Sequence, residues 1–140
     1  MRSTPHKVLV VDDDPFHLEI YGLLLKQAGY EPVPALVRFT GPDFPADPHI
    51  NAIILDSRLN SKKSSSEIAC QIRRRYPHAP IVLLSDVQWL PTDIAPYVAD
   101  FVQRGEPGEL LGKISALVRQ SSFQSAANYA RPLVPCTAIQ

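Results

Sequence analysis

Acidic side chains directly follow two apolar runs of the sequence, and their chemistry is that of a cation site. Asp12–Asp14 come after Val8–Val11, and Asp56 comes after Ile53–Leu55. Carboxylates a few ångström apart repel one another and raise one another's pKa, so a pocket made of them needs a cation. Oxygen ligands with room left for water suit a hard octahedral ion, and we therefore expect Mg²⁺ at this site.

Alternating strands and helices must position these carboxylates. We predict strands at 7–11, 30–35, 52–55, 81–84 and 101–102, and helices at about 14–28, 66–76 and 110–120. The first, third and fourth strands are uniformly apolar, which is typical of strands covered on both faces. Pro32 and Pro34 remove ladder donors and favour an edge position for the second strand. Prolines also interrupt 36–49, where we expect mostly loop, and 89–99, where we expect a short helix at most.

This element order predicts an α/β fold, a flavodoxin-like, doubly wound, five-stranded parallel sheet with strand order 2-1-3-4-5. Parallel strands joined by right-handed crossovers share one carboxyl edge, where ligand sites form. The first strand has to lie between the second and third for the aspartates to converge. The same rim then receives Ser85, which follows the fourth strand, and Arg104, which follows the fifth.

Length and charge narrow the remaining choices. The 140 residues suit one domain, which we assign to residues 1–120, followed by a flexible tail at 121–140. The formal net charge is zero, so no direct binding of nucleic acid is expected. No apolar run reaches the roughly 20 residues of a membrane span, and no signal-peptide pattern follows the N-terminus, so we expect a cytoplasmic protein without a membrane anchor. The sequence leaves open whether the chain is a fragment of a longer protein.

The chain resembles the receiver domains of two-component response regulators, the CheY-like family, over about residues 6–120. The resemblance is carried by Val8–Pro15, Asp56, Ser85 and Phe101–Arg104 taken together. It implies that Asp56 accepts a phosphoryl group and that Ser85 hydrogen-bonds that group. It also implies that Phe101 moves on activation, and that Mg²⁺ is held by Asp12, Asp13, Asp56 and the backbone carbonyl of Arg58.

The function implied by this resemblance is regulatory rather than enzymatic. A receiver would take a phosphoryl group from the phosphohistidine of a histidine kinase or phosphotransfer protein, in a Mg²⁺-assisted reaction, and would then change its binding to a downstream protein. Phosphoryl transfer mainly needs its negative charge neutralised and held in line, which the ion, a basic side chain and the Ser85 hydroxyl can do. A homodimer remains open as a further partner.

Two other functions compete with this one. Arg104 stands where the family has lysine, and Asp86 stands where the family has a very small residue, which favours a receiver-like interaction module that works without phosphorylation. Asp12-x-Asp14 after an apolar strand, with Ser85 after another, is also the nucleophile arrangement of haloacid-dehalogenase-like phosphatases. That class needs a later acidic pair and a cap, for which the chain is short.

Overall fold

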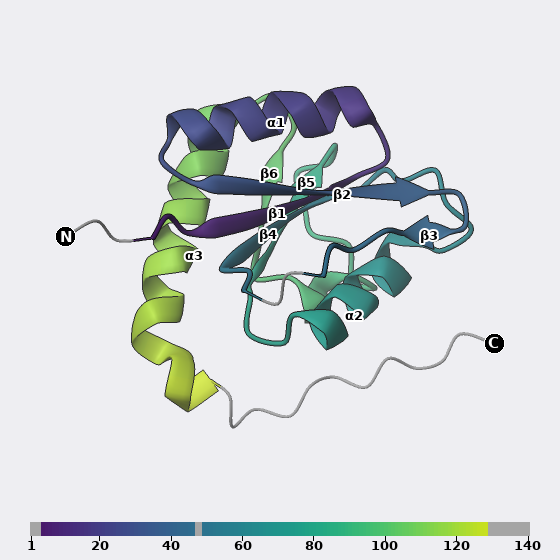
Figure 1. The fold of residues 1–140 in the computed structure, drawn as a ribbon. Helices are drawn as coiled ribbons and strands as arrows, with labels where there is room; N and C mark the ends of the chain where they lie inside the picture. Colours follow the sequence, from purple (N-terminus) through teal and green to yellow (C-terminus); the bar gives the residue numbers. More distant parts are fainter. Residues whose placement is uncertain (1–3, 47–48, 129–140) are drawn as a thin grey trace.

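A central sheet lies between two layers of helices (Figure 1) in the computed structural model, which describes residues 4–46 and 49–128. The strands are β1 (Lys7–Asp12), β2 (Glu31–Arg38), β3 (Gly41–Pro42), β4 (Ala52–Asp56), β5 (Ile81–Ser85) and β6 (Asp100–Gln103). The helices are α1 (Pro15–Gln27), α2 (Ser65–Arg75) and α3 (Pro107–Asn128), with one 3₁₀ turn, η1 (Ala95–Tyr97).

The strand order is β3-β2-β1-β4-β5-β6, and the five longer strands run parallel. This confirms the predicted order 2-1-3-4-5 and the flavodoxin-like fold. The predicted count of five strands was wrong by one, because β3 pairs antiparallel with the end of β2. A turn at 39–40 folds the chain back so that Pro42 lies opposite Val37, and Gly41, directly after the turn, has a φ of +140° that favours glycine.

Each face of the sheet is covered by its own helices. Side chains of α2, among them Ile68 and Ile72, pack with alternate residues of the strands on one face. Leu25 of α1 and Ile114 of α3 pack with the intervening strand residues on the other face. Strands covered on both sides need apolar residues throughout, which is why β4 and β5 carry no polar residue before their last position.

The helices begin where local chemistry predicts. Asp14 caps α1 by accepting a hydrogen bond from the Phe16 N–H (2.9 Å), and Gly29 follows the helix with a φ of +92°. Ser64 and Glu67 form a capping box at the start of α2. Helix α3 continues to Asn128, past the predicted end at about residue 120. The rest of the predicted tail, 129–140, lies outside the described residues.

The segment between β5 and β6 forms only one short helical turn. Two prolines, Pro91 and Pro96, lie in this segment, and the only regular helical structure described there is η1. This confirms the prediction of a short helix at most in this segment.

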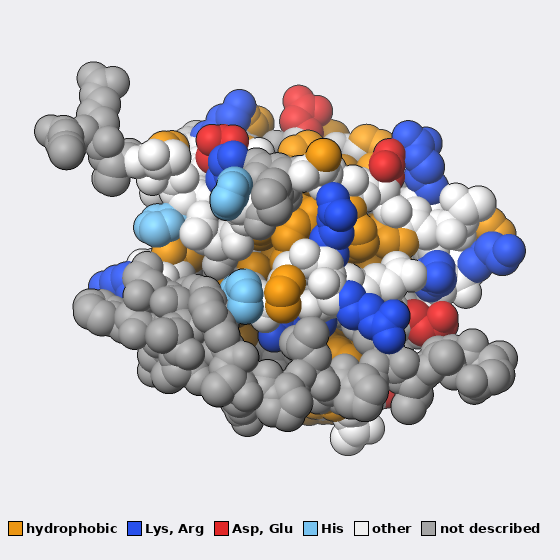
Figure 2. Space-filling model, turned by 60° about the horizontal axis from the view of Figure 1, so that its bottom comes forward, with side chains coloured by type: hydrophobic (Ala, Val, Ile, Leu, Met, Phe, Trp, Pro, Cys, Tyr) orange, Lys and Arg blue, Asp and Glu red, His pale blue; other side chains and the backbone are white. Residues whose placement is uncertain are grey.

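Figure 2 looks towards the side of the molecule that carries α2, where lysine and arginine side chains lie in several separate places. At the end of α2, Arg73 donates to the carbonyl oxygens of Pro77 and Ala79, and Arg75 donates to that of Pro45. These two arginines therefore tie loops to the helix.

Within the described residues, none of the helices combines the length and the apolar character needed to cross a membrane.

Candidate functional site

The ends of four parallel strands bring the predicted site residues to one rim of the sheet. Val11 of β1 is in register with Leu55 of β4, so Asp12 and Asp56, the next residues, leave adjacent strands at the same level. Ser85 ends β5, and the Arg104 N–H donates to its carbonyl oxygen at 3.0 Å. Asp12, Asp56 and Ser85 are the buried polar residues of the described chain.

The two buried aspartates have opposite protonation behaviour. Burial raises the pKa of Asp12 to about 8, and the neighbouring Asp56 raises it as well. Burial acts in the same direction on Asp56, but hydrogen bonds from Arg104 and from the Arg58 backbone N–H outweigh it and lower the pKa of Asp56. Without a further cation, Asp56 is therefore ionised at neutral pH and Asp12 is largely protonated.

Arg104 binds both Asp56 and Asp86. Its two terminal nitrogens donate to the two Asp56 carboxylate oxygens, one of them at 3.1 Å, and its Nε donates to Asp86 Oδ1 at 2.6 Å. Asp86 Oδ2 in turn lies 2.6 Å from Arg58 Nε. These four residues form a row of alternating charges, Asp56, Arg104, Asp86 and Arg58, which we call the charge row. Although burial lowers the pKa of Arg104, the two carboxylates raise it above its ordinary value.

The charge row places the two arginines in roles that sequence reasoning had only partly anticipated. The sequence predicts Arg104 at this rim, but its bidentate contact with Asp56 does not follow from the strand and helix pattern. Gly105, with a φ of +83°, turns the backbone directly after Arg104. The planar guanidinium fork can engage two carboxylates at once, which a lysine ammonium in this position could do only as a point charge.

The remaining predicted residues lie around this centre. Asp13 Oδ2 accepts a hydrogen bond from the Asn60 N–H at 2.8 Å, which joins the first acidic cluster to the loop after β4. The Ser85 hydroxyl accepts one from the Val87 N–H at 3.1 Å. Phe101 packs at the edge of the core on the α2 side, and Lys113 Nζ lies 5.8 Å from the centroid of its ring.

His17 is a neighbour of the site that sequence analysis missed. It lies in the first turn of α1, and its Nδ1 is 3.4 Å from Asp12 Oδ2. One ligand atom each from Asp12, His17 and Asp56 lie within 4.8 Å of one another. The five-residue step from Asp12 to His17 spans a strand end and a helix start. Neither the strand nor the helix period predicts that these side chains meet; the only signal was a histidine within one turn of the Asp14 cap.

The donor set fits a divalent cation. Asp12 is 1% exposed, and its Oδ2 has no hydrogen-bond partner, which is a costly state for a buried carboxylate oxygen. Its Oδ1 accepts from the Asp14 N–H at 3.1 Å, so only Oδ2 is left over. A cation between Asp12 and Asp56 would satisfy this oxygen and would oppose the rise in the pKa of Asp12.

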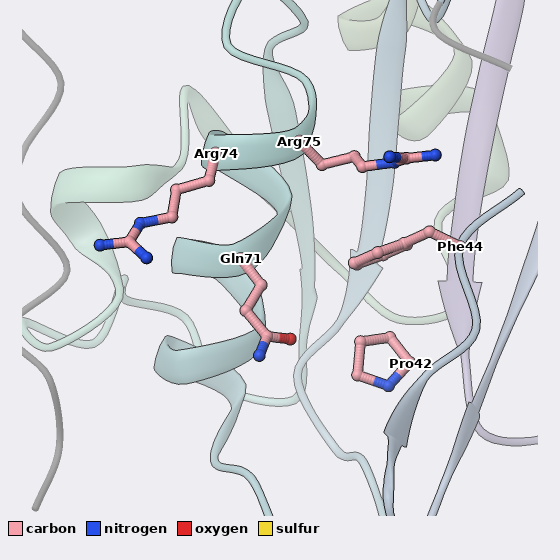
Figure 3. Close-up of a pocket in the computed structure, with 5 residues that line it drawn as sticks. All are labelled: Pro42, Phe44, Gln71, Arg74 and Arg75. Carbon is pink, nitrogen blue, oxygen red and sulfur yellow. The ribbon is translucent and has the colours of Figure 1, made fainter. Parts of the chain in front are cut away.

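A surface hollow of the described residues lies away from this site. It has a volume of about 510 Å³ and lies between α2 and the chain after β3. Figure 3 shows its lining, with Arg74 pointing away from Phe44. Its residues are Pro42, Phe44, Gln71, Arg74 and Arg75, and none of them belongs to the acidic rim. This hollow is therefore separate from the acidic rim.

Comparison with known proteins relates the chain to others through its structure. No protein-family model matches the sequence, and no curated protein matches it. A CheY-like response regulator receiver domain protein from Methanospirillum hungatei JF-1 superposes with a TM-score of 0.68 at 16% identity, covering 86% of this chain and 99% of that one. The response regulator TrrA from Thermotoga maritima, solved with Mg²⁺ and BeF, gives 0.64 at 27% identity, covering 80% and 98%.

A third similar structure is that of a longer protein. NtrX from Brucella abortus, solved with ADP, gives a TM-score of 0.70 at 18% identity, with 96% of this chain covered but only 31% of NtrX. The chain thus spans about a third of NtrX, whereas it matches nearly the whole length of the other two. Its fold is that of the CheY-like response regulator receiver domains.

Proposed function

We propose that the chain is a receiver domain that accepts a phosphoryl group on Asp56 and changes its binding to other proteins as a result. The observation that carries this proposal is the state of Asp56. It is buried at the carboxyl edge of the sheet, beside a second carboxylate, and it is kept ionised by Arg104. An ionised carboxylate next to a cation is the nucleophile that phosphoryl transfer requires.

The same electrostatics select Asp56 over Asp12 as the acceptor. The pKa of Asp12 is raised to about 8, so in the absence of metal Asp12 is a poor nucleophile at neutral pH. This argues against the phosphatase arrangement, in which Asp12 would attack the phosphorus. Asp12 serves better as a metal ligand, because binding of a cation displaces its proton.

Each side chain at the rim then has one task. Asp12, Asp13 and Asp56, with the backbone carbonyl of Arg58, would hold Mg²⁺, which when bound neutralises charge on the transferring group. The Asp56 oxygen attacks the phosphorus, and the bond from phosphorus to the donor histidine nitrogen breaks. Arg104 moves from the Asp56 carboxylate to the new phosphoryl oxygens, and the Ser85 hydroxyl donates to them. Phe101 then shifts into the space that the Ser85 loop leaves.

This role is regulatory, and its donor is a phosphohistidine on a histidine kinase or phosphotransfer protein. A downstream protein would recognise the phosphorylated state, either alone or as a dimer of this chain. Such donors place the chain in the cytoplasm. The similar TrrA structure, solved with Mg²⁺ and BeF, supports a magnesium site in this fold.

A second candidate function is supported by the charge row. Both Asp56 oxygens are engaged by Arg104, and Asp86 holds Arg104 through its Nε. A module in which this arrangement is permanent would use the receiver fold for binding without accepting phosphate. The carboxylate of Asp86 would also repel an anionic donor.

One experiment separates the two candidates. The protein is incubated with Mg²⁺ and acetyl phosphate, and its intact mass is measured beside that of Asp56→Asn. We expect the wild type to gain one phosphoryl group and the variant to gain none. A beryllofluoride titration followed by Trp89 fluorescence or NMR provides a second readout. Absence of both responses in the wild type would leave the interaction module as the function.

A further inference from the structure

The imidazole of His17 faces the acidic pair with one ring nitrogen that lacks a hydrogen-bond partner. Its Nδ1 and Asp12 Oδ2 are both buried and without a hydrogen bond, although they lie only 3.4 Å apart. A hydrogen bond between them would satisfy both atoms, so their lack of one needs another explanation. Two ligand atoms that lack hydrogen bonds and face one another at this distance could both bind one metal ion placed between them.

The separation of the two atoms matches that of two ligands on one small metal ion. Metal-to-ligand distances of about 2.0–2.2 Å with tetrahedral angles place neighbouring ligand atoms about 3.3 Å apart. Asp56 supplies a third ligand atom, and all three lie within 4.8 Å of one another. A small contraction around an ion would bring this set to bonding distances, because His17 lies on a partly exposed first helical turn that can adjust.

The other ring nitrogen of His17 has a neighbour of the kind that orients metal-binding histidines. Its Nε2 lies 3.6 Å from Asp14 Oδ2, which is too long for a hydrogen bond but close enough for attraction. Histidine ligands usually present their second N–H to a carboxylate, which fixes the ring and increases its basicity. Asp14, the cap of α1, can provide this contact without leaving the helix end.

We propose that His17 is a nitrogen ligand of the cation at this rim, and that the site therefore binds first-row transition-metal ions such as Co²⁺ or Zn²⁺ in preference to Mg²⁺. An imidazole nitrogen adds much to the affinity for these ions and little to that for Mg²⁺, which prefers oxygen ligands. The inference rests on the cation site of the proposed function but adds a ligand and an ion class to it. Asp14 acts as the residue that orients His17.

The test uses Co²⁺, whose visible absorption reports on its ligands, with the full chain. Wild type, His17→Ala and His17→Gln are titrated with Co²⁺ and Mg²⁺, and Glu19→Gln, an exposed position on the same helix, is the matched control. We expect the Co²⁺ affinity of both His17 variants to fall about tenfold or more, which is the usual effect of removing a metal ligand or the residue that orients it. Their Mg²⁺ affinity should change little. Asp14→Asn keeps a good helix cap and should weaken Co²⁺ binding less than His17→Ala does.

A second readout identifies the nitrogen directly. In the wild type with Mn²⁺, pulsed electron paramagnetic resonance should show coupling to a directly bound nitrogen, and this coupling should vanish in His17→Gln. Unchanged Co²⁺ affinity in both His17 variants, absence of Co²⁺ binding in the wild type, or absence of nitrogen coupling would each overturn the inference.

The outcome is separable from that of the proposed function. If the wild type fails to take up a phosphoryl group but shows nitrogen coupling that depends on His17, the receiver function fails and the metal inference stands. If His17→Ala still takes up the phosphoryl group with Mg²⁺ and the wild type shows no nitrogen coupling, the receiver function stands and the metal inference fails.

Discussion

Asp12 and Asp56 are both buried carboxylates, yet the charges around them make them chemically different. Arg104 and the Arg58 N–H lower the pKa of Asp56, whereas Asp12 has no such cation and its pKa rises to about 8. A protonated Asp12 beside an ionised Asp56 relieves the repulsion that two charged carboxylates would have. The acidic rim is thus stable without metal, but Asp12 must lose a proton when a metal binds.

The raised pKa of Asp12 predicts a specific pH dependence of stability. In the folded state Asp12 binds its proton more tightly than in the unfolded chain, where its pKa is near its usual 3.8. Its contribution to stability is therefore complete below that value and is lost as the pH rises through about 8. The lowered pKa of Asp56 has the opposite effect on stability, but this effect appears only when the pH falls below the usual pKa of an aspartate.

We therefore expect the melting temperature of the protein in chelator to fall as the pH is raised from about 5 to about 9. In Asp12→Asn, which keeps the shape of the side chain and cannot ionise, this fall should be smaller. Thermal unfolding followed by circular dichroism across the pH series measures both. An equal fall in the two proteins would show that Asp12 is ionised throughout the range.

Asp86 offers a second prediction at the level of single residues. Its removal takes one anion from the rim and leaves Arg104 free to follow an incoming phosphoryl group. We expect Asp86→Ala to take up a phosphoryl group from acetyl phosphate about fivefold faster, which corresponds to about 1 kcal/mol for a partly exposed ion pair. Asp93→Ala, an exposed aspartate of the same loop, is the control and should react at the wild-type rate. A rate unchanged by Asp86→Ala would contradict this role.

At the scale of elements, the parts that follow from local sequence were predictable. Uniformly apolar strands can be predicted from their own sequence, and Asp14 before Pro15 predicts the start of α1. The two-residue strand β3 was not predictable, because its pairing depends on contact with β2 rather than on its own sequence. The contacts of Arg104 and His17 were missed for the same reason, since they join side chains from different elements.

Helix α1 carries apolar residues on its outer as well as its inner side. Phe16, Ile20 and Leu23 recur at helical spacing and are 65%, 45% and 57% exposed, while Leu25 is fully buried. Apolar character alone therefore does not tell which side of this helix faces the core. The outer three residues form an apolar stripe on the molecular surface.

This difference between the two sides of α1 can be measured with a matched pair of substitutions. Leu25→Ala should lower the free energy of unfolding by about 2–5 kcal/mol, because it leaves a cavity in the core. Leu23→Ala should change it by less than about 0.5 kcal/mol, as at other exposed positions. Urea unfolding of both variants provides the comparison, and similar losses would mean that the stripe is covered in solution.

At the scale of the whole molecule, stability should be unevenly distributed. β1, β4 and β5 are paired on both sides and buried on both faces, whereas the segment 86–99 has little regular structure. Segments with few buried contacts open locally more often than core strands do. The part of the molecule between β5 and β6 is therefore the part most able to change shape without global unfolding.

Hydrogen exchange measures this distribution directly. We expect the amides of 87–94 to exchange far faster than those of β4 and β5, in the protein without metal or phosphoryl donor. Beryllofluoride with Mg²⁺ should slow exchange near Val87, whose N–H already donates to the Ser85 hydroxyl. Uniform protection across 81–103 would show that this segment is as rigid as the strands around it.

The charge row has one end in the core and the other in water. Asp56 is 2% exposed, whereas the side chain of Arg58 is 74% exposed and contacts Asp86, which in turn binds Arg104. Extra negative charge at the inner end would draw Arg104 inward and weaken its contact with Asp86. The contact between Asp86 and the Arg58 side chain would then change as well. A modification at the buried inner end of the charge row would thus change the position of a guanidinium on the molecular surface.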